Sequence, residues 1–86
     1  MRVVLPSPLF SYTCGQKEIE ATSDSLAQLL LVLDHRYPGL RHRIIDEQGR
    51  IRRHIRFFVN GAQKRDLAEP LAESDEIMIV CALSGG

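Results

Sequence analysis

The chain has 86 residues, of which 44% are apolar and 26% are charged, an ordinary composition for one globular domain. Eleven basic and eleven acidic residues give a formal net charge of zero, so no global field favours nucleic acid or an anionic membrane. The longest uncharged apolar run, residues 26–33, is too short to span a bilayer. We therefore expect a single cytoplasmic domain over residues 1–86, with Cys14 and Cys81 as free thiols and with no nucleic-acid or membrane partner.

The N-terminal part predicts a β-hairpin. Residues 2–13, RVVLPSPLFSYT, are rich in residue types that favour strands. Pro6 and Pro8 each remove a backbone donor, which indicates an edge, a bulge or a brief break at that point. Residues 14–16 supply a turn, and residues 17–22, KEIEAT, form a second strand with one solvated face.

A helix of about three turns follows the hairpin. Ser25 can cap its N-terminus, and Gln28 three residues later completes the sequence form of a capping box. Leucines at positions 26, 29, 30 and 33 have the spacing of one apolar helix face. The helix is expected to end at Tyr37-Pro38-Gly39, because proline disfavours helical backbone in the residue before it.

The second half is β in character. In RIIDEQGRI, residues 46–49 predict a turn between Ile44-Ile45 and Ile51. Residues 54–59 form a strand that ends in a tight turn at Asn60-Gly61. Residues 66–71 are an irregular connection, and residues 76–83 are the last strand. The expected fold class is α+β, a mixed sheet of four to five strands with one main helix on one face.

Alternation along two of these strands separates an inner from an outer face. Positions expected to face the helix are apolar: Ile55, Phe57, Val59, Ile77, Ile79 and Cys81. The outer face is also apolar in part, because it holds Phe58, Met78 and Val80, followed by Ala82. Such a patch on a sheet is a candidate docking surface, unless a loop partly covers it.

No catalytic, metal-binding or phosphate-binding motif occurs. The three histidines have no metal-ligand spacing with each other or with the cysteines. Any chemistry would then need a group that every chain has. The C-terminal carboxylate is such a group, and it ends a segment with small or no side chains, Ser84-Gly85-Gly86. The charges are also sorted: seven arginines lie between residues 36 and 56, and five acids lie between residues 66 and 76. This pattern fits either solvated surfaces or complementary docking.

Taken together, the element order, the FFVNG strand, the acidic turn before EIMIV and the terminal LSGG resemble the β-grasp, ubiquitin-like sulfur carriers of the MoaD and ThiS family. The likeness covers the whole chain. The stretches YTCGQKEIEATSDSLAQLL, GRIRRHIRFFVNG and ALSGG are most similar to the CysO-like branch, which serves cysteine biosynthesis.

The resemblance implies a protein substrate and not an enzyme. An adenylating partner of the MoeB/ThiF type uses ATP and magnesium to convert the Gly86 carboxylate into an acyl adenylate, and a sulfur donor then displaces AMP to leave a thiocarboxylate. The carrier itself binds no cofactor or metal. Residues 83–86 would then act as a flexible tail: Leu83 anchors its root, Ser84 is small enough to be compatible, and Gly85 and Gly86 fit a narrow channel where a Cβ would clash. Docking in this family points to four positions of this chain: Phe58, Met78, Val80 and, on the rim, Arg56.

The resemblance implies two further partners, namely a sulfur-accepting enzyme, such as one of the cysteine-synthase type, and a zinc metalloprotease. The product stays open between cysteine, a molybdopterin-type cofactor, thiamin and a specialised metabolite. Two alternatives remain. One is a ubiquitin-like modifier joined through Gly86 to lysines. The other is an interaction module that uses Arg52 and Arg53 to bind an acidic partner or RNA.

Overall fold

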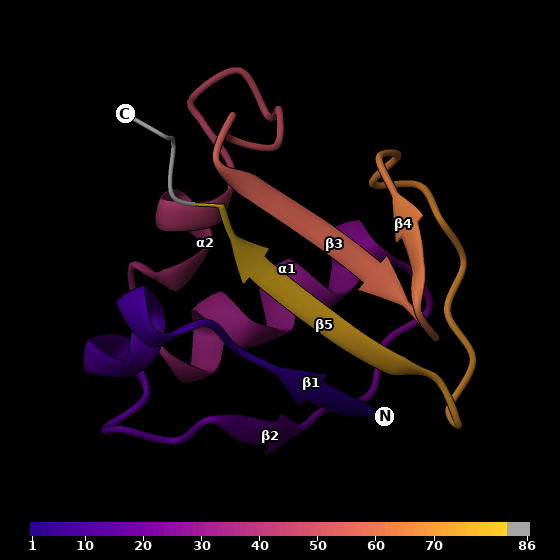
Figure 1. Ribbon diagram of the computed structural model, residues 1–86, viewed down its shortest axis with the longest axis horizontal. Helices are drawn as coiled ribbons and strands as arrows, with labels where there is room; N and C mark the ends of the chain where they lie inside the picture. The colour runs from indigo at the N-terminus through magenta and orange to yellow at the C-terminus, as the bar shows by residue number, and fades with distance from the viewer. Residues whose placement is uncertain (83–86) are drawn as a thin grey trace.

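The computed structural model describes residues 1–82, which form a five-stranded mixed sheet with its main helix across one face (Figure 1). The strands are β1 (Arg2–Val4), β2 (Glu18–Glu20), β3 (Ile55–Val59), β4 (Ala62–Lys64) and β5 (Glu76–Cys81). Their order in the sheet is β2-β1-β5-β3-β4, and only the β1–β5 pair is parallel. Helix α1 (Leu26–Arg36) lies behind the sheet in Figure 1, and no helix of residues 1–82 crosses the opposite face. The expected α+β fold is confirmed.

The core lies between α1 and the inner face of the sheet. All four predicted leucines of α1 are at most 1% exposed, and Phe57 and Ile77 on the facing strands are fully buried. Burying a leucine or phenylalanine side chain contributes about 1.5–3 kcal/mol to the free energy of unfolding. The predicted inner positions of β3 and β5 are buried as expected, apart from Cys81, which is half-buried against the edge of the core.

The first turn of α1 is closed from two sides. Ser25 Oγ accepts a hydrogen bond from the Gln28 amide at 3.2 Å, which confirms the predicted cap. The Ser25 amide donates to Ser23 Oγ instead of to the Gln28 side chain. The connection between β4 and β5 supplies two carbonyl oxygens to the start of the helix. The Glu69 oxygen accepts from the Leu26 amide, and the Leu67 oxygen accepts from the Ala27 amide. This irregular segment therefore satisfies donors that a helix terminus leaves open.

The strand predicted over residues 2–13 is wrong beyond Val4. Residues Ser7–Tyr12 form a 3-10 helix, η1, which Pro6 precedes and whose first turn contains Pro8. Proline is tolerated in a first helical turn because the amide hydrogen that it lacks has no helical partner there. The two prolines therefore start a helical turn, and Leu9 within it is buried.

A second difference is α2 (Leu40–Ile44), which occupies residues expected to lead into a strand. Gly39 adopts a positive φ of 95° and caps the helix, and Asp34 Oδ1 accepts hydrogen bonds from the amides of Gly39 and Arg41, both at 3.1 Å. Leu40 and Ile44 are four residues apart and are both fully buried. The burial of this helical face therefore outweighs the strand propensity of the β-branched residues Ile44 and Ile45.

The expected turn at residues 46–49 is present between Ile45 and Ile51, which form an isolated β-bridge. Asp46 Oδ1 accepts from the amides of Arg50 and Gln48, both at 2.9 Å. The Arg50 amide contributes most to holding the pKa of the Asp46 carboxyl below its ordinary value.

Strand β4 was not predicted, whereas the turn before it was. Asn60 and Gly61 have φ values of 51° and 86°, the pair of positive angles that a two-residue hairpin turn needs. The turn folds residues 62–64 back onto β3, with Phe57 opposite Lys64. Ala-Gln-Lys has little strand propensity of its own, so the hairpin geometry decides its structure.

Candidate functional site

The apolar residues predicted on the outer face of the sheet lie together. Phe58 on β3 is paired with Met78 on β5, and Arg56 is paired with Val80. Met78 is 40% exposed, and Phe58 and Val80 are half-buried. With Gly61 and Glu76, the three apolar side chains line a shallow groove of about 440 Å³, which we call the apolar groove. The predicted placement of these residues on one uncovered face is confirmed.

Val4, which was not assigned to this face from the sequence, extends it onto a third strand. Parallel pairing sets Val4 beside Met78, and the alternation of β1 turns the fully buried Val3 toward the core. Val4 is half-buried on the outer side. The alternation of Arg2, Val3 and Val4 indicates that Val4 faces outward. It does not indicate that Met78 is its neighbour, because that depends on the pairing of β1 with β5.

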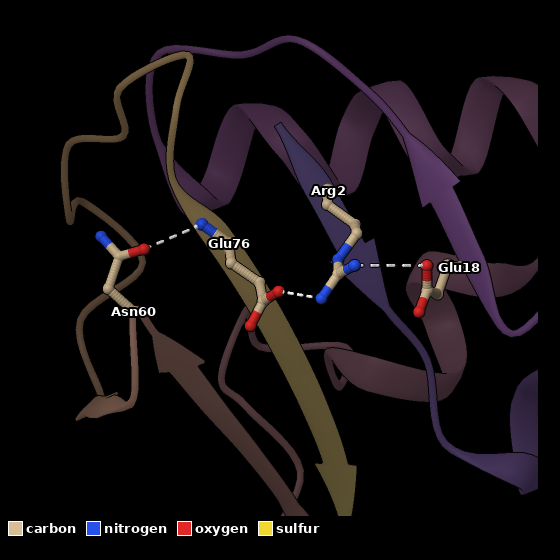
Figure 2. Close-up of polar contacts among 4 residues, drawn as sticks. All are labelled: Arg2, Glu18, Asn60 and Glu76. Carbon is tan, nitrogen blue, oxygen red and sulfur yellow. Dashed lines mark hydrogen bonds and ion pairs between the residues drawn. The ribbon is translucent and has the colours of Figure 1, made fainter.

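A polar cluster adjoins the end of the apolar groove that Glu76 lines, and Figure 2 shows its side chains. The guanidinium of Arg2 lies between the carboxylates of Glu76 and Glu18: it forms an ion pair with Glu76, and its Nη1 is 3.7 Å from Glu18 Oε2. The hydrogen bond to Glu76, followed by the charge of Glu18, raises the pKa of Arg2. Exposed ion pairs of this kind are screened by solvent and add little stability. They give this end of the face a mixed, polar rim.

Asn60 and Asp75 hold the neighbouring turn. Asn60 Oδ1 accepts from the Glu76 amide at 3.0 Å (Figure 2), and Asn60 Nδ2 donates to Asp75 Oδ1 at 2.9 Å. Asp75 Oδ2 accepts from the Ala72 amide at 2.8 Å. The Ala72 amide contributes most, and the Asn60 side chain next, to lowering the pKa of the Asp75 carboxyl. These bonds fix Gly61 and Glu76, which line the groove.

The other end of the face is basic and leads to the last described residues. Arg56 is exposed, and its guanidinium bonds the carbonyl oxygens of Ile55, at 3.0 Å, and Arg53. The Ala82 amide donates to the His54 carbonyl oxygen at 2.6 Å. Residue 82 therefore lies at the Arg56 end of the face. The predicted site residues Leu83, Ser84, Gly85 and Gly86 lie outside the described residues.

Within residues 1–82, no group of three or more histidine, cysteine, aspartate or glutamate side chains is arranged to hold a metal ion. Cys14 is exposed and Cys81 is half-buried, and both are free thiols, as expected. None of the helices in this part of the chain is long and apolar enough to cross a membrane.

A mixed five-stranded sheet that grasps one main helix, with parallel terminal strands at its centre, defines a β-grasp, ubiquitin-like protein. Comparison of the sequence with family models refines this class. The model of the ThiS family matches residues 3–86, and the chain belongs to that family.

Three comparisons with known proteins agree with this membership. The chain is 32% identical over 89 aligned positions to the sulfur carrier protein CysO of Mycobacterium tuberculosis, covering 98% of this chain and 96% of the relative. The structure of a BexX/CysO complex from Amycolatopsis orientalis matches with a TM-score of 0.89 and 25% identity, over 99% of this chain and 98% of the other. Small archaeal modifier protein 1 of Methanosarcina acetivorans matches with a TM-score of 0.80 and 30% identity, over 99% and 94%.

Proposed function

We propose that this protein is a sulfur carrier whose C-terminal Gly86 carboxylate is adenylated and then converted to a thiocarboxylate. The observation that carries the proposal is the nearly full-length similarity to the sulfur carrier protein CysO, together with membership of the ThiS family. In this proposal the chain is a cytoplasmic co-substrate and not an enzyme. ATP and magnesium belong to the activating partner, which is an adenylating enzyme of the MoeB/ThiF type.

The chemistry needs only the carboxylate of this chain. A carboxylate is a poor electrophile until it carries a good leaving group. Attack of the Gly86 carboxylate on the α-phosphate of ATP forms the acyl adenylate and releases pyrophosphate. A sulfur nucleophile then forms the C–S bond as the C–O bond to AMP breaks. Gly85 and Gly86 carry no Cβ, so the main chain can enter a narrow active site.

The apolar groove is the proposed docking surface for the adenylating enzyme. An exposed Met78 flanked by half-buried Phe58 and Val80 offers a compact apolar centre, and Arg56 lies on its rim. Interfaces of this kind depend on a few central apolar residues inside a polar border. Because residue 82 lies at the Arg56 end of this face, an enzyme bound there is close to the start of residues 83–86.

Downstream, we expect a sulfur-accepting enzyme, with cysteine as the favoured product because CysO is a relative that matches over nearly the full length. That CysO forms a complex with BexX in Amycolatopsis orientalis supports a stable protein partner for this chain too. A zinc metalloprotease that trims adducts of the thiocarboxylate completes the proposed set of partners.

Intact-mass analysis tests the proposal. The full chain is incubated with an adenylating enzyme of its source organism, ATP, magnesium and sulfide. The expected result is the mass increase of one oxygen replaced by sulfur, located at Gly86 by fragmentation. A reaction without ATP is the control. If the mass is unchanged with an enzyme that is shown to adenylate its own carrier, the proposal is wrong.

A second candidate is a ubiquitin-like modifier whose Gly86 forms isopeptide bonds with lysines. The likeness to small archaeal modifier protein 1 favours it, because identity and TM-score are both substantial over nearly the whole chain. Both functions begin with adenylation and differ in the nucleophile. Products of high mass that carry Gly86 on lysine, without exchange of oxygen for sulfur, support the modifier.

A further inference from the structure

A second groove, separate from the apolar groove, lies at the free edge of the sheet where β4 ends. It has a volume of about 360 Å³, and five cationic residues line it: Arg52, Arg53, Arg56, Lys64 and Arg65. They come from three segments, namely the loop before β3, β3 itself and the end of β4. We call this the basic groove.

The cations of this groove are largely without acidic partners. Among the described residues, only Lys64 has a carboxylate within 4 Å, that of Glu69 at 3.6 Å. Arg52 uses its Nε to bond the His42 carbonyl oxygen at 2.8 Å, and Arg56 bonds carbonyl oxygens of its own loop and strand. A cleft lined by one sign of charge concentrates ions of the opposite sign. The groove therefore attracts anionic groups.

Among the described residues, only one acid of the segment 66–76 pairs with a groove cation, namely Glu69 with Lys64. Asp66 Oδ1 accepts from the Ala68 amide at 2.9 Å, Asp75 holds two turns together, and Glu76 pairs with Arg2. Apart from the Lys64–Glu69 pair, the cations of the groove and the acids of this segment thus form no ion pairs with each other among the described residues. The four arginines of the basic groove therefore have no carboxylate partner among residues 1–82 and remain available to anions of another molecule.

The backbone at the groove is closed to an added strand. β4 pairs with β3 only as far as Phe57, which leaves the edge beside Ile55 open. The Ile55 amide, however, donates to the Arg52 carbonyl oxygen at 3.0 Å, and the Ile55 carbonyl oxygen accepts from the Arg56 guanidinium at 3.0 Å. With these groups satisfied, recognition here depends on side-chain charge.

The lining also disfavours single-stranded nucleic acid. Sites for unpaired bases combine cations with exposed aromatic rings for stacking. The only aromatic residue that lines this groove is Phe57, and its side chain is fully buried. The chain as a whole carries no net positive charge, and acids flank Arg2 on the same sheet. Carboxylates spaced along a polypeptide match cations that are spread over three segments better than a single-stranded nucleic acid does.

We propose that the basic groove binds an acidic segment of a partner protein. Arg56 borders this groove, and its β3 neighbour Phe58 lines the apolar groove. His54, next to Arg53, holds Ala82. An acidic segment in the basic groove therefore sets the orientation of a partner beside residue 82. The binding itself does not depend on the chemistry at Gly86, so it is tested on the chain alone.

The test is a titration of the ¹⁵N-labelled full chain with a short peptide of alternating glutamate and serine. Amide shifts are expected at residues 51–56 and 63–65, with affinity that falls as salt is raised. Arg53→Glu with Arg65→Glu should weaken binding by roughly tenfold or more. Both side chains are exposed and form no hydrogen bond or ion pair with residues 1–82. Lys17→Glu with Arg43→Glu changes the net charge equally outside the groove, and should leave affinity nearly unchanged.

Three results would overturn the proposal. The first is an absence of binding, or shifts confined to residues around Phe58 and Met78. The second is equal weakening by both double variants, which would indicate a general charge effect. The third is tighter binding of a single-stranded oligonucleotide or of tripolyphosphate at residues 51–56 and 63–65. None of these outcomes bears on thiocarboxylate formation, which the intact-mass experiment decides separately.

Discussion

Ala82 is held to His54 by a 2.6 Å hydrogen bond from its amide to the carbonyl oxygen. This bond directly follows the last paired residues of the two strands, Ile55 and Cys81. The rigid sheet therefore fixes where the segment that ends in Gly86 begins. The apolar groove and the basic groove both adjoin β3. A partner that uses either groove therefore binds at β3, the strand that pairs with β5, after which residues 83–86 follow.

The first prediction concerns the terminal carboxylate. Appending one alanine after Gly86 turns that carboxylate into an amide and places a side chain in the path of the tail. Thiocarboxylate formation should be lost, and the midpoint of urea unfolding should stay the same because the core is untouched. Intact-mass analysis measures the first effect and circular dichroism the second. Sulfur incorporation by the extended chain at the wild-type level would refute the assignment of Gly86 as the reactive residue.

The second prediction concerns the apolar groove. Met78→Asp places a charge at the centre of the proposed interface and should weaken binding to the adenylating enzyme by about 2 kcal/mol or more. Leu31→Asp is the matched control, because Leu31 is 53% exposed on α1, on the covered side of the sheet. Isothermal titration calorimetry compares the two. Equal losses of affinity would show that docking does not use this face.

The third prediction separates packing from docking at two neighbouring phenylalanines. Phe57 is fully buried, so Phe57→Ala should lower the free energy of unfolding by about 3–5 kcal/mol. Phe58 is half-buried on the outer face, so Phe58→Ala should cost clearly less stability but should weaken binding of the adenylating enzyme. Urea denaturation and calorimetry on both variants check the contrast. A reversed order of stability would contradict the inner and outer faces assigned to β3.

The fourth prediction concerns pH. The pKa of Asp75 is lowered in the folded state relative to an ordinary value of 3.8. The stabilising effect of the ionised carboxylate is therefore complete above the ordinary pKa. As the pH falls, the Asp75 carboxylate is protonated first in the unfolded chain, and its stabilising effect declines. The effect is lost below the lowered pKa of the folded state. Asp75→Asn should be less stable than the wild type at neutral pH, with a difference that shrinks in acid.

The control for the pH experiment is Glu73→Gln, which removes an exposed carboxylate from the same turn. This variant should follow the wild-type stability curve at each pH when unfolding by urea is measured. A constant difference between Asp75→Asn and the wild type across the acid range would show that the ionised Asp75 does not stabilise the turn.

Several elements could be predicted because their causes are local. Helix α1 depends on Ser25 and on a leucine stripe of helical spacing, and the hairpin turn depends on Asn60-Gly61. The outer position of Met78 follows from alternation along a single strand. For the same reason the burial of Phe57 was predicted correctly.

The errors occurred where distant contacts decide the backbone. Helix α2 depends on Asp34, which caps it from the preceding helix, and on the burial of Ile44 in a core that the whole fold builds. Strand β4 exists because the turn returns a weakly strand-forming segment to β3. The half-burial of Cys81 likewise reflects its place near the end of the core.

The sequence by itself determined the α+β class, the helix, the apolar character of the outer face and the small residues before Gly86, because spacing, turn chemistry and alternation are properties of short segments. Only the tertiary structure decided that Val4 lies beside Met78, and that cations from three segments form one groove. The physical reason is that parallel pairing of β1 with β5, and the return of β4 to β3, bring together residues far apart in the chain.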